Sequence, residues 1–263
     1  MTADGRAAES VGRDPDPTAA SLHVLPRDAV VNVAGLTKRY GDLIAVDELT
    51  FWLRAGTVTG FLGPNGAGKT TTLRLMLGLA EPTAGEALVF GRRYRDLDQP
   101  CRWAGAVLES NDFDPGRSGG DHLRALALAA EIPWARVDEV LELVDLAAGA
   151  RRRVGTYSLG MRQRLGLAAA LLGAPELLIL DEPMNGLDPA GVHWLRSFLR
   201  SFAEAGGTVL IASHMLAEVA QSVDQVLIIH RGRLVADARL EELTRDGRTL
   251  EDVYLGLTAG GAS

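Results

Sequence analysis

The stretch that decides the fold is Thr57–Thr70, which reads TVTGFLGPNGAGKT. Its first part, Thr57–Leu62, is apolar and rich in β-branched residues, which predicts a buried strand. The next eight residues fit the spacing G-x-x-x-x-G-K-[ST], and the apolar residues after them predict a helix over Thr70–Leu79. The pattern indicates a phosphate-binding loop when a strand precedes it and a helix follows it, as is predicted for this stretch.

The residue types in this loop suit a phosphate group. Glycines allow the backbone to curl around a phosphate, and the start of the helix adds N–H groups with partial positive charge. Lys69 can extend a compact ammonium group to the outer phosphates, and Thr70 can give its hydroxyl oxygen to Mg²⁺. The residues expected to hold the phosphates are Gly63, Pro64, Asn65, Gly66, Ala67, Gly68, Lys69, Thr70 and Thr71.

A second predicted strand ends in two acids. Leu177–Leu180 is wholly apolar, as in a strand buried on both faces of a parallel sheet, and Asp181 and Glu182 follow it directly. Ligands of α/β proteins bind at the carboxyl ends of such strands. We therefore expect Asp181 to hold Mg²⁺ and Glu182 to act as a general base or to position a water molecule.

The remaining chain alternates between strands and helices. Val209–Ala212 and Gln225–Ile229 are further apolar strands, and the second is expected to pair with Leu234-Val235 through the turn Arg231-Gly232. The segment 121–147 has apolar residues at helical spacing and is expected to be mostly helical. This pattern predicts an α/β fold with a helical insertion at about 105–165.

Composition narrows the class of protein. The 263 residues carry a formal net charge of −7, which disfavours bare nucleic acid as the main partner. No apolar run is long enough for a membrane span, and the single cysteine excludes an internal disulfide. Residues 1–29 are expected to form a disordered tail without a signal peptide. Of the 27 basic residues, only Lys38 and Lys69 are lysine.

Four further features lie along the chain, one before the phosphate-binding loop and three after it. Tyr40 precedes the loop in Lys38–Gly41, KRYG, and Tyr157–Arg164, YSLGMRQR, is similar to the signature L-S-G-G-Q. Asn185–Asp188, NGLD, resembles a D-loop, and His214 follows a predicted strand as a switch histidine does. Over about residues 30–257, the chain resembles the nucleotide-binding subunit of an ATP-binding cassette (ABC) transporter.

The resemblance implies a P-loop NTPase core with a mainly parallel sheet, an N-terminal antiparallel β subdomain and the inserted helical subdomain. It implies that ATP and Mg²⁺ are bound, and that Ser158 and Gly160 bind the γ-phosphate held by a second protomer, most simply in a homodimer. Tyr40 lies where the family stacks an aromatic ring on adenine, and Asp188 of the D-loop and Val46 are also expected among the nucleotide contacts. The expected catalytic residues are Lys69, Glu182 and His214.

Two positions depart from the family pattern. Glu109 stands where the family commonly has the Q-loop glutamine, and it is the expected third Mg²⁺ ligand, with Asn111 as the competing candidate. In the signature, Leu159 and Met161 replace glycine and glutamine. These two variants resemble a branch of bacterial export cassettes of the drug- and lantibiotic-resistance type.

The expected function is that of an ATPase subunit at the cytoplasmic face of the plasma membrane, which energises an exporter whose permease is a separate chain. One alternative is a non-transport cassette acting on ribosomes or in DNA repair, but no heptad run lies between Lys69 and Asp181. The other is an immunity or regulatory cassette that binds without transport. The expected domain boundaries are a tail at 1–29, the cassette at 30–257 and a short tail at 258–263.

Overall fold

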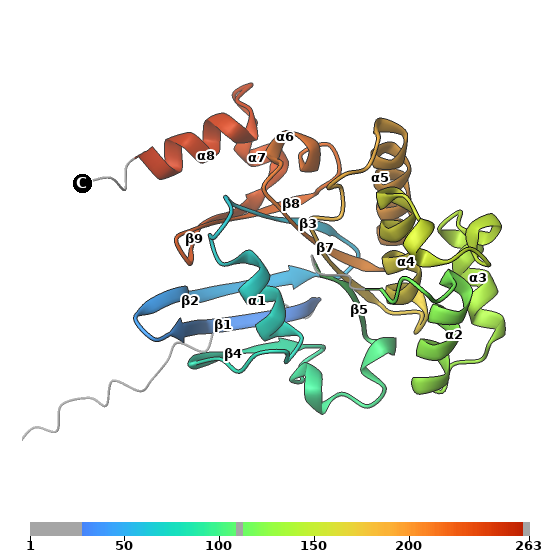
Figure 1. Cartoon of the computed structure of the whole chain (residues 1–263). Coiled ribbons are helices and arrows are strands. Elements are labelled where there is room, and N and C mark those ends of the chain that lie inside the picture. The colour runs from blue at the N-terminus through green and yellow to red at the C-terminus, as the bar shows by residue number, and fades with distance from the viewer. Residues whose placement is uncertain (1–27, 109–112, 260–263) are drawn as a thin grey trace, which may run out of the picture.

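The computed structural model describes residues 28–108 and 113–259, whose strands form two sheets. The larger sheet has the strand order β5-β6-β7-β3-β8-β9, and the smaller has the order β2-β1-β4. Helix α1, Lys69–Met76, packs between them, because its buried Leu73 and Met76 belong to a core that both sheets share (Figure 1). The predicted α/β class with an antiparallel N-terminal part is confirmed.

The larger sheet is parallel except at one edge, where β9 runs antiparallel to β8. Its central strands are apolar because both faces are covered. In β6, Leu178 and Leu180 face a core shared with the helices, whereas Leu177 and Ile179 face the core shared with the smaller sheet. The strands are β3 (Val58–Leu62), β5 (Ala104–Val107), β6 (Leu177–Asp181), β7 (Thr208–Ser213), β8 (Gln225–His230) and β9 (Arg233–Arg239).

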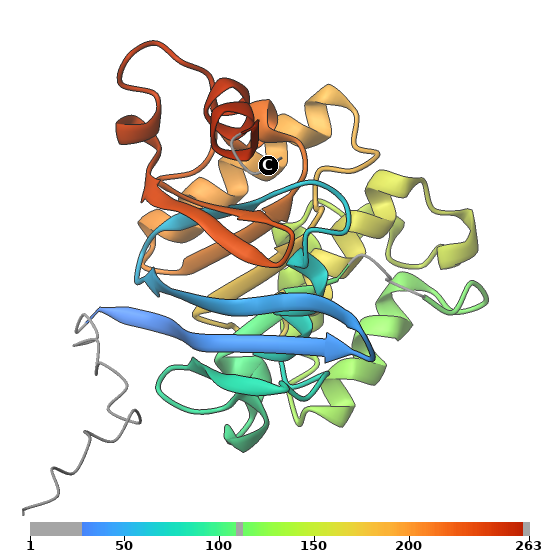
Figure 2. The ribbon, with the colours of Figure 1, turned by 90° about the vertical axis from the view of Figure 1, so that its left-hand side faces the viewer.

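The smaller sheet consists of β1 (Ala29–Tyr40), β2 (Leu43–Arg54) and β4 (Ala84–Val89), all antiparallel. Figure 2 shows β4, β1 and β2 in that order from bottom to top, with β9 above β2. The two sheets are joined near β9, where Asp47 N–H donates to Gly232 O at 2.9 Å. Arg233 also pairs with the Asp47 carboxylate at 2.7 Å.

The helices form a group beside α4 and a group near the C-terminus (Figure 1). α5 illustrates why they form: Asp188 caps it by accepting from Gly191 N–H at 2.8 Å, and Leu195 and Leu199 are buried one turn apart. Beyond α1, the helices are α2 (Gly119–Ala129), α3 (Ala135–Leu143), α4 (Leu159–Leu171), α5 (Pro189–Glu204), α6 (Leu216–Val219), α7 (Leu240–Leu243) and α8 (Leu250–Ala259).

Several predicted boundaries differ from the structure. Residues 104–107 belong to the sheet as β5, so the helical insertion begins later than the expected 105, and its last helix continues to Leu171. The C-terminal tail expected at 258–263 overlaps α8, which continues to Ala259, and the Thr258 hydroxyl donates to Tyr254 O within this helix at 2.8 Å. The tail expected at 1–29 lies outside the described residues except for Asp28 and Ala29.

Candidate functional site

The phosphate-binding loop connects β3 to α1, as its sequence predicts. Gly63 and Gly68 are packed so closely that a Cβ at either position would clash, at Gly63 with the carbonyl oxygen of Ile229 and at Gly68 with that of Ala45. Gly68 is the N-cap of α1 in the left-handed region, with φ 107°, and has no side chain with which to cap the helix. The first N–H groups of α1 therefore point toward the loop, as required for binding an anion.

Lys69 is held inside this loop. Its side chain is only 6% exposed, and its ammonium group donates to Gly63 O at 2.8 Å and to Pro64 O at 3.3 Å. Glu182 Oε1 lies 3.6 Å from Lys69 Nζ. The carbonyl contacts fix the extended side chain along the loop, so its charge is aimed at the space that the loop encloses.

The predicted magnesium ligands meet across two elements. Thr70 Oγ1, in the first turn of α1, donates to Asp181 Oδ2 at the end of β6 over 2.7 Å. Both groups supply hard oxygen atoms, which are the ligands that Mg²⁺ prefers. The donor set therefore fits a magnesium ion between the loop and β6. Glu109, the predicted third ligand, lies outside the described residues, as does Asn111.

Glu182 lies at the centre of the site. Its backbone has φ 50°, in the left-handed region, and its N–H donates to Ala212 O at 2.9 Å. Its carboxylate is 8% exposed, with Oε1 at 2.9 Å from His214 Nδ1 and Oε2 accepting from Ser213 Oγ at 3.1 Å. The structure thus brings together the three residues predicted to be catalytic, and it adds Ser213, to which the sequence analysis assigned no role.

A cleft of about 460 Å³ opens above these residues, within the size range of small-molecule sites. Predicted residues that line it are Tyr40, Asn65, Gly66, Gly68, Lys69, Thr70, Thr71, Glu182 and His214. Sequence reasoning missed three others, Leu43, Ile44 and Ala45, and it quoted Asn185 only as part of the D-loop motif. Val46 is fully buried in the core and is not among the lining residues, so the structure does not support its predicted role as a nucleotide contact. Its alternation with Ala45 along β2 turns its side chain inward.

Tyr40 is half exposed at the rim of the cleft, as a base-stacking ring must be. Lys38 Nζ lies 5.0 Å from the centre of this ring and donates to Glu81 O at 2.6 Å. The ammonium group thus covers the ring while it is anchored to the chain after α1. This gives the second lysine of the chain a physical role that its sequence context does not reveal.

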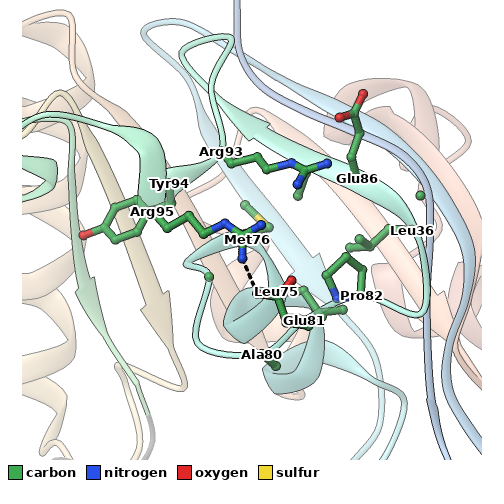
Figure 3. A pocket seen from close by; sticks show the side chains of 13 residues that line it. Leu36, Leu75, Met76, Ala80, Glu81, Pro82, Glu86, Arg93, Tyr94 and Arg95 are labelled. Atoms are coloured by element: carbon green, nitrogen blue, oxygen red, sulfur yellow. Dashed lines mark hydrogen bonds and ion pairs between the residues drawn. The ribbon is translucent and has the colours of Figure 1, made fainter.

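A small pocket lies beside this anchor, between β4 and the chain that follows α1 (Figure 3). Its volume is about 40 Å³, too small for a nucleotide. Figure 3 shows Arg95 pointing toward Glu81, with which it forms an ion pair. The pocket is therefore separate from the candidate site.

The signature and the D-loop form a second, exposed surface. Ser158 caps α4 by accepting from Met161 N–H at 3.2 Å, and Gly160 is only partly covered. A Cβ at Gly186 would clash with the Leu159 side chain, so the signature leucine packs directly over the D-loop. Ser158, Gly160 and Asp188 do not line the cleft around Lys69. The structure therefore does not bring these three predicted contacts into the same site as the phosphate-binding loop.

Comparison with known proteins agrees with this geometry. The family model described as "ABC transporter" matches residues 46–185. The Bacitracin transport ATP-binding protein BcrA of Bacillus licheniformis is 42% identical over 222 residues, which cover 83% of this chain and 72% of the relative. The Daunorubicin resistance ATP-binding protein DrrA3 of Streptomyces coeruleorubidus is 40% identical over 221 residues, covering 82% of this chain and 70% of that one.

A solved structure shows the same fold. It is titled "Structure of ATP binding subunit of ABC transporter", superposes with a TM-score of 0.78 at 28% identity, and the match covers 87% of this chain and 99% of that one. Within the described residues, no helix is both long enough and apolar enough to cross a membrane. Fold, motif geometry and relatives agree that the chain belongs to the ABC transporter family and carries its ATP-binding domain.

Proposed function

We propose that the chain is a Mg²⁺-dependent ATPase subunit that energises a membrane exporter. The observation that carries the proposal is the convergence of Lys69, His214 and Ser213 on the carboxylate of Glu182, next to the contact of Thr70 with Asp181. The proposal is supported by a buried cation suited to phosphate, two oxygen groups suited to a metal ion and a carboxylate that can accept a proton, which lie close together. These are the parts that phosphoryl transfer to water requires.

In the proposed mechanism, the loop N–H groups and Lys69 hold the β and γ phosphates of ATP. Thr70 and Asp181 hold Mg²⁺, which when bound neutralises charge on the phosphate oxygens. Glu182 accepts the proton of the attacking water, and His214, which contacts Oε1 of Glu182, orients the γ-phosphate. Tyr40 stacks on the adenine at the rim of the cleft.

The signature surface completes the site in a second protomer. Ser158 and Gly160 lie at the start of α4, where a partly open helix N-terminus suits the γ-phosphate of ATP bound by the partner. Because each protomer offers a loop to its partner's signature, the arrangement predicts a two-fold homodimer. Asp188 caps α5 beside this surface, so its contribution is to hold the D-loop at the interface.

The transport part of the proposal rests on relatives. BcrA is named for bacitracin transport and DrrA3 for daunorubicin resistance. We infer that this chain, like them, serves the export of an antibiotic, drug or similar compound. Its partner is then a permease in a separate chain, which holds it at the cytoplasmic face of the plasma membrane. Glu109 is proposed to replace the Q-loop glutamine as a Mg²⁺ ligand, and Glu109→Ala should weaken Mg²⁺-dependent turnover.

Purification of the tagged chain from its native membranes in mild detergent tests this proposal. We expect a multi-span membrane protein to co-purify, together with ATP hydrolysis that stops when EDTA removes Mg²⁺. Recovery with ribosomes or DNA in place of a membrane protein would indicate a non-transport cassette. Hydrolysis that continues in EDTA would contradict the assigned metal site at Thr70 and Asp181.

A further inference from the structure

Ser213, the last residue of β7, connects three parts of the site. It is buried, and its carbonyl oxygen accepts from Gly63 N–H, the first residue of the phosphate-binding loop, at 3.3 Å. Its hydroxyl group accepts from Met215 N–H at 3.0 Å and is 3.1 Å from Glu182 Oε2. One residue thus contacts the loop, the chain that carries His214, and the carboxylate of Glu182.

The direction of the hydrogen bond to Glu182 is fixed by the other partner. Because Met215 N–H is a donor, it occupies a lone pair of Ser213 Oγ and leaves the hydroxyl proton free to point elsewhere. An ionised carboxylate only accepts hydrogen bonds, so that proton goes to Glu182 Oε2. Such a bond to a charged acceptor is stronger than one between neutral groups.

The two carboxylate oxygens have different neighbours. Oε1 faces Lys69 at 3.6 Å and His214 at 2.9 Å, two cationic or titratable groups from α1 and from the chain after β7. The proposed function assigns both of these groups to the γ-phosphate. Asp181 precedes Glu182 in the chain and contacts Thr70 through its Oδ2. Of these three side chains that contact the Glu182 carboxylate, Ser213 is the neutral donor, and the proposed function assigns it no contact with the nucleotide.

We propose that Ser213 is a positioning residue for the general base. It holds Oε2 of Glu182 when Lys69 and His214 engage the γ-phosphate, so Oε1 stays aimed at the attacking water. The left-handed backbone at Glu182 fixes where its side chain begins, but three rotatable bonds separate that point from the carboxylate. A second contact, at the carboxylate itself, keeps the general base within hydrogen-bond reach of the water proton that it accepts. The inference rests on the proposed function.

The test compares Ser213→Ala with Ser213→Thr, which keeps the hydroxyl group. We expect Ser213→Ala to lower kcat about tenfold, the effect of one net hydrogen bond on a barrier, while KM for ATP stays within about twofold. Ser213→Thr should recover most of the lost kcat. Ser222→Ala is the matched control, because Ser222 is also a buried serine and lies outside the cleft. A similar loss of kcat in Ser222→Ala would show a general packing effect and overturn the proposal.

A double variant gives the sharper readout. If Ser213 acts only through Glu182, Ser213→Ala should cause no further loss of single-turnover rate in a Glu182→Gln background. Independent, multiplicative losses would overturn the proposal. If Ser213→Ala leaves kcat unchanged while Glu182→Gln is inactive, the positioning role fails and the proposed function stands. If Glu182→Gln hydrolyses ATP normally, Glu182 is not the general base, and this result contradicts the proposed function itself. Thermal unfolding and ATP-binding affinity of each variant check that the fold and cleft are intact.

Discussion

The phosphate-loop side and the signature side of this molecule are built in opposite ways. Around the loop, Lys69 and Glu182 are almost fully buried and hydrogen bonds join α1, β6 and β7. On the signature side, Ser158 and Asp188 are exposed, and their side chains accept hydrogen bonds from the first turns of the helices that they cap. Leu159, which is 53% exposed, covers the D-loop instead of a core.

This difference indicates which parts of ATP binding and hydrolysis one chain can carry out without a partner. Buried, mutually bonded groups are preorganised, so they can hold a phosphate and a metal without further rearrangement. An exposed helix N-terminus offers N–H groups but has no surrounding residues that exclude water, so it needs a second protein surface to complete an anion-binding site. Variants on the two sides should therefore have different defects. Loop variants should lose ATP binding or hydrolysis within one protomer, whereas signature variants should lose the steps that require two protomers.

The largest effect is expected from Lys69→Arg. The ammonium group is enclosed by Gly63 O and Pro64 O, and a planar guanidinium has neither the room nor the geometry to replace it. Phosphate release should fall about a thousandfold although the charge is kept. Arg74→Lys, on the exposed face of the same helix, is the matched exchange and should retain turnover. Turnover near normal in Lys69→Arg would contradict the enclosed-ammonium geometry.

Glu182→Gln should separate binding from hydrolysis. The amide keeps the size of the side chain but cannot accept a proton from water, so hydrolysis should fall about a hundredfold or more. ATP binding should persist, because Lys69 and Thr70 are unchanged. We also expect ATP to trap a dimer, visible as a doubled mass in light scattering. A variant that stays monomeric with ATP would weaken the homodimer proposal.

Ser158→Ala and Ser118→Ala compare the two serine-capped helices. Ser118 caps α2 as Ser158 caps α4, with N–H to Oγ distances of 3.1 and 3.2 Å. Each variant should lose about 1 kcal/mol of unfolding free energy in a denaturant titration. Only Ser158→Ala should also lower ATP turnover, by about tenfold, because only that helix start is proposed to face a nucleotide in the dimer. If both variants hydrolyse ATP at the same rate, Ser158 only caps α4 and has no role toward the nucleotide.

The smallest effect is expected at the rim of the cleft. Tyr40→Ala removes a stacking surface worth about 1–3 kcal/mol, so KM for ATP should rise about tenfold while kcat changes little. Tyr40→Phe keeps the ring and should behave like the wild type. A KM that does not change in Tyr40→Ala would place the adenine elsewhere, for example against Leu43 or Ile44, which also line the cleft.

Much of the fold and the loop was predictable because it depends on neighbours in sequence. The apolar runs before Gly63 and Asp181 predicted β3 and β6, and the pairing of β8 with β9 through Arg231-Gly232 is confirmed. Strand β5 was missed as part of the sheet, since its four residues, AGAV, lack the large apolar side chains of its neighbours. It becomes a strand because β6 offers it a parallel partner.

The sequence by itself determined the prediction of what this protein binds: the glycine spacing, Lys69 and the acids after Leu180 already predict a phosphate-binding loop and a strand end suited to a metal ion. The tertiary structure decided how these groups hold one another. That Glu81 O anchors Lys38 beside Tyr40, that Val46 packs into the core shared by the two sheets and that Ser213 donates to Glu182 all depend on chain segments tens of residues apart. Loop motifs are local backbone patterns, whereas the orientation of a side chain is set by whatever the fold packs against it.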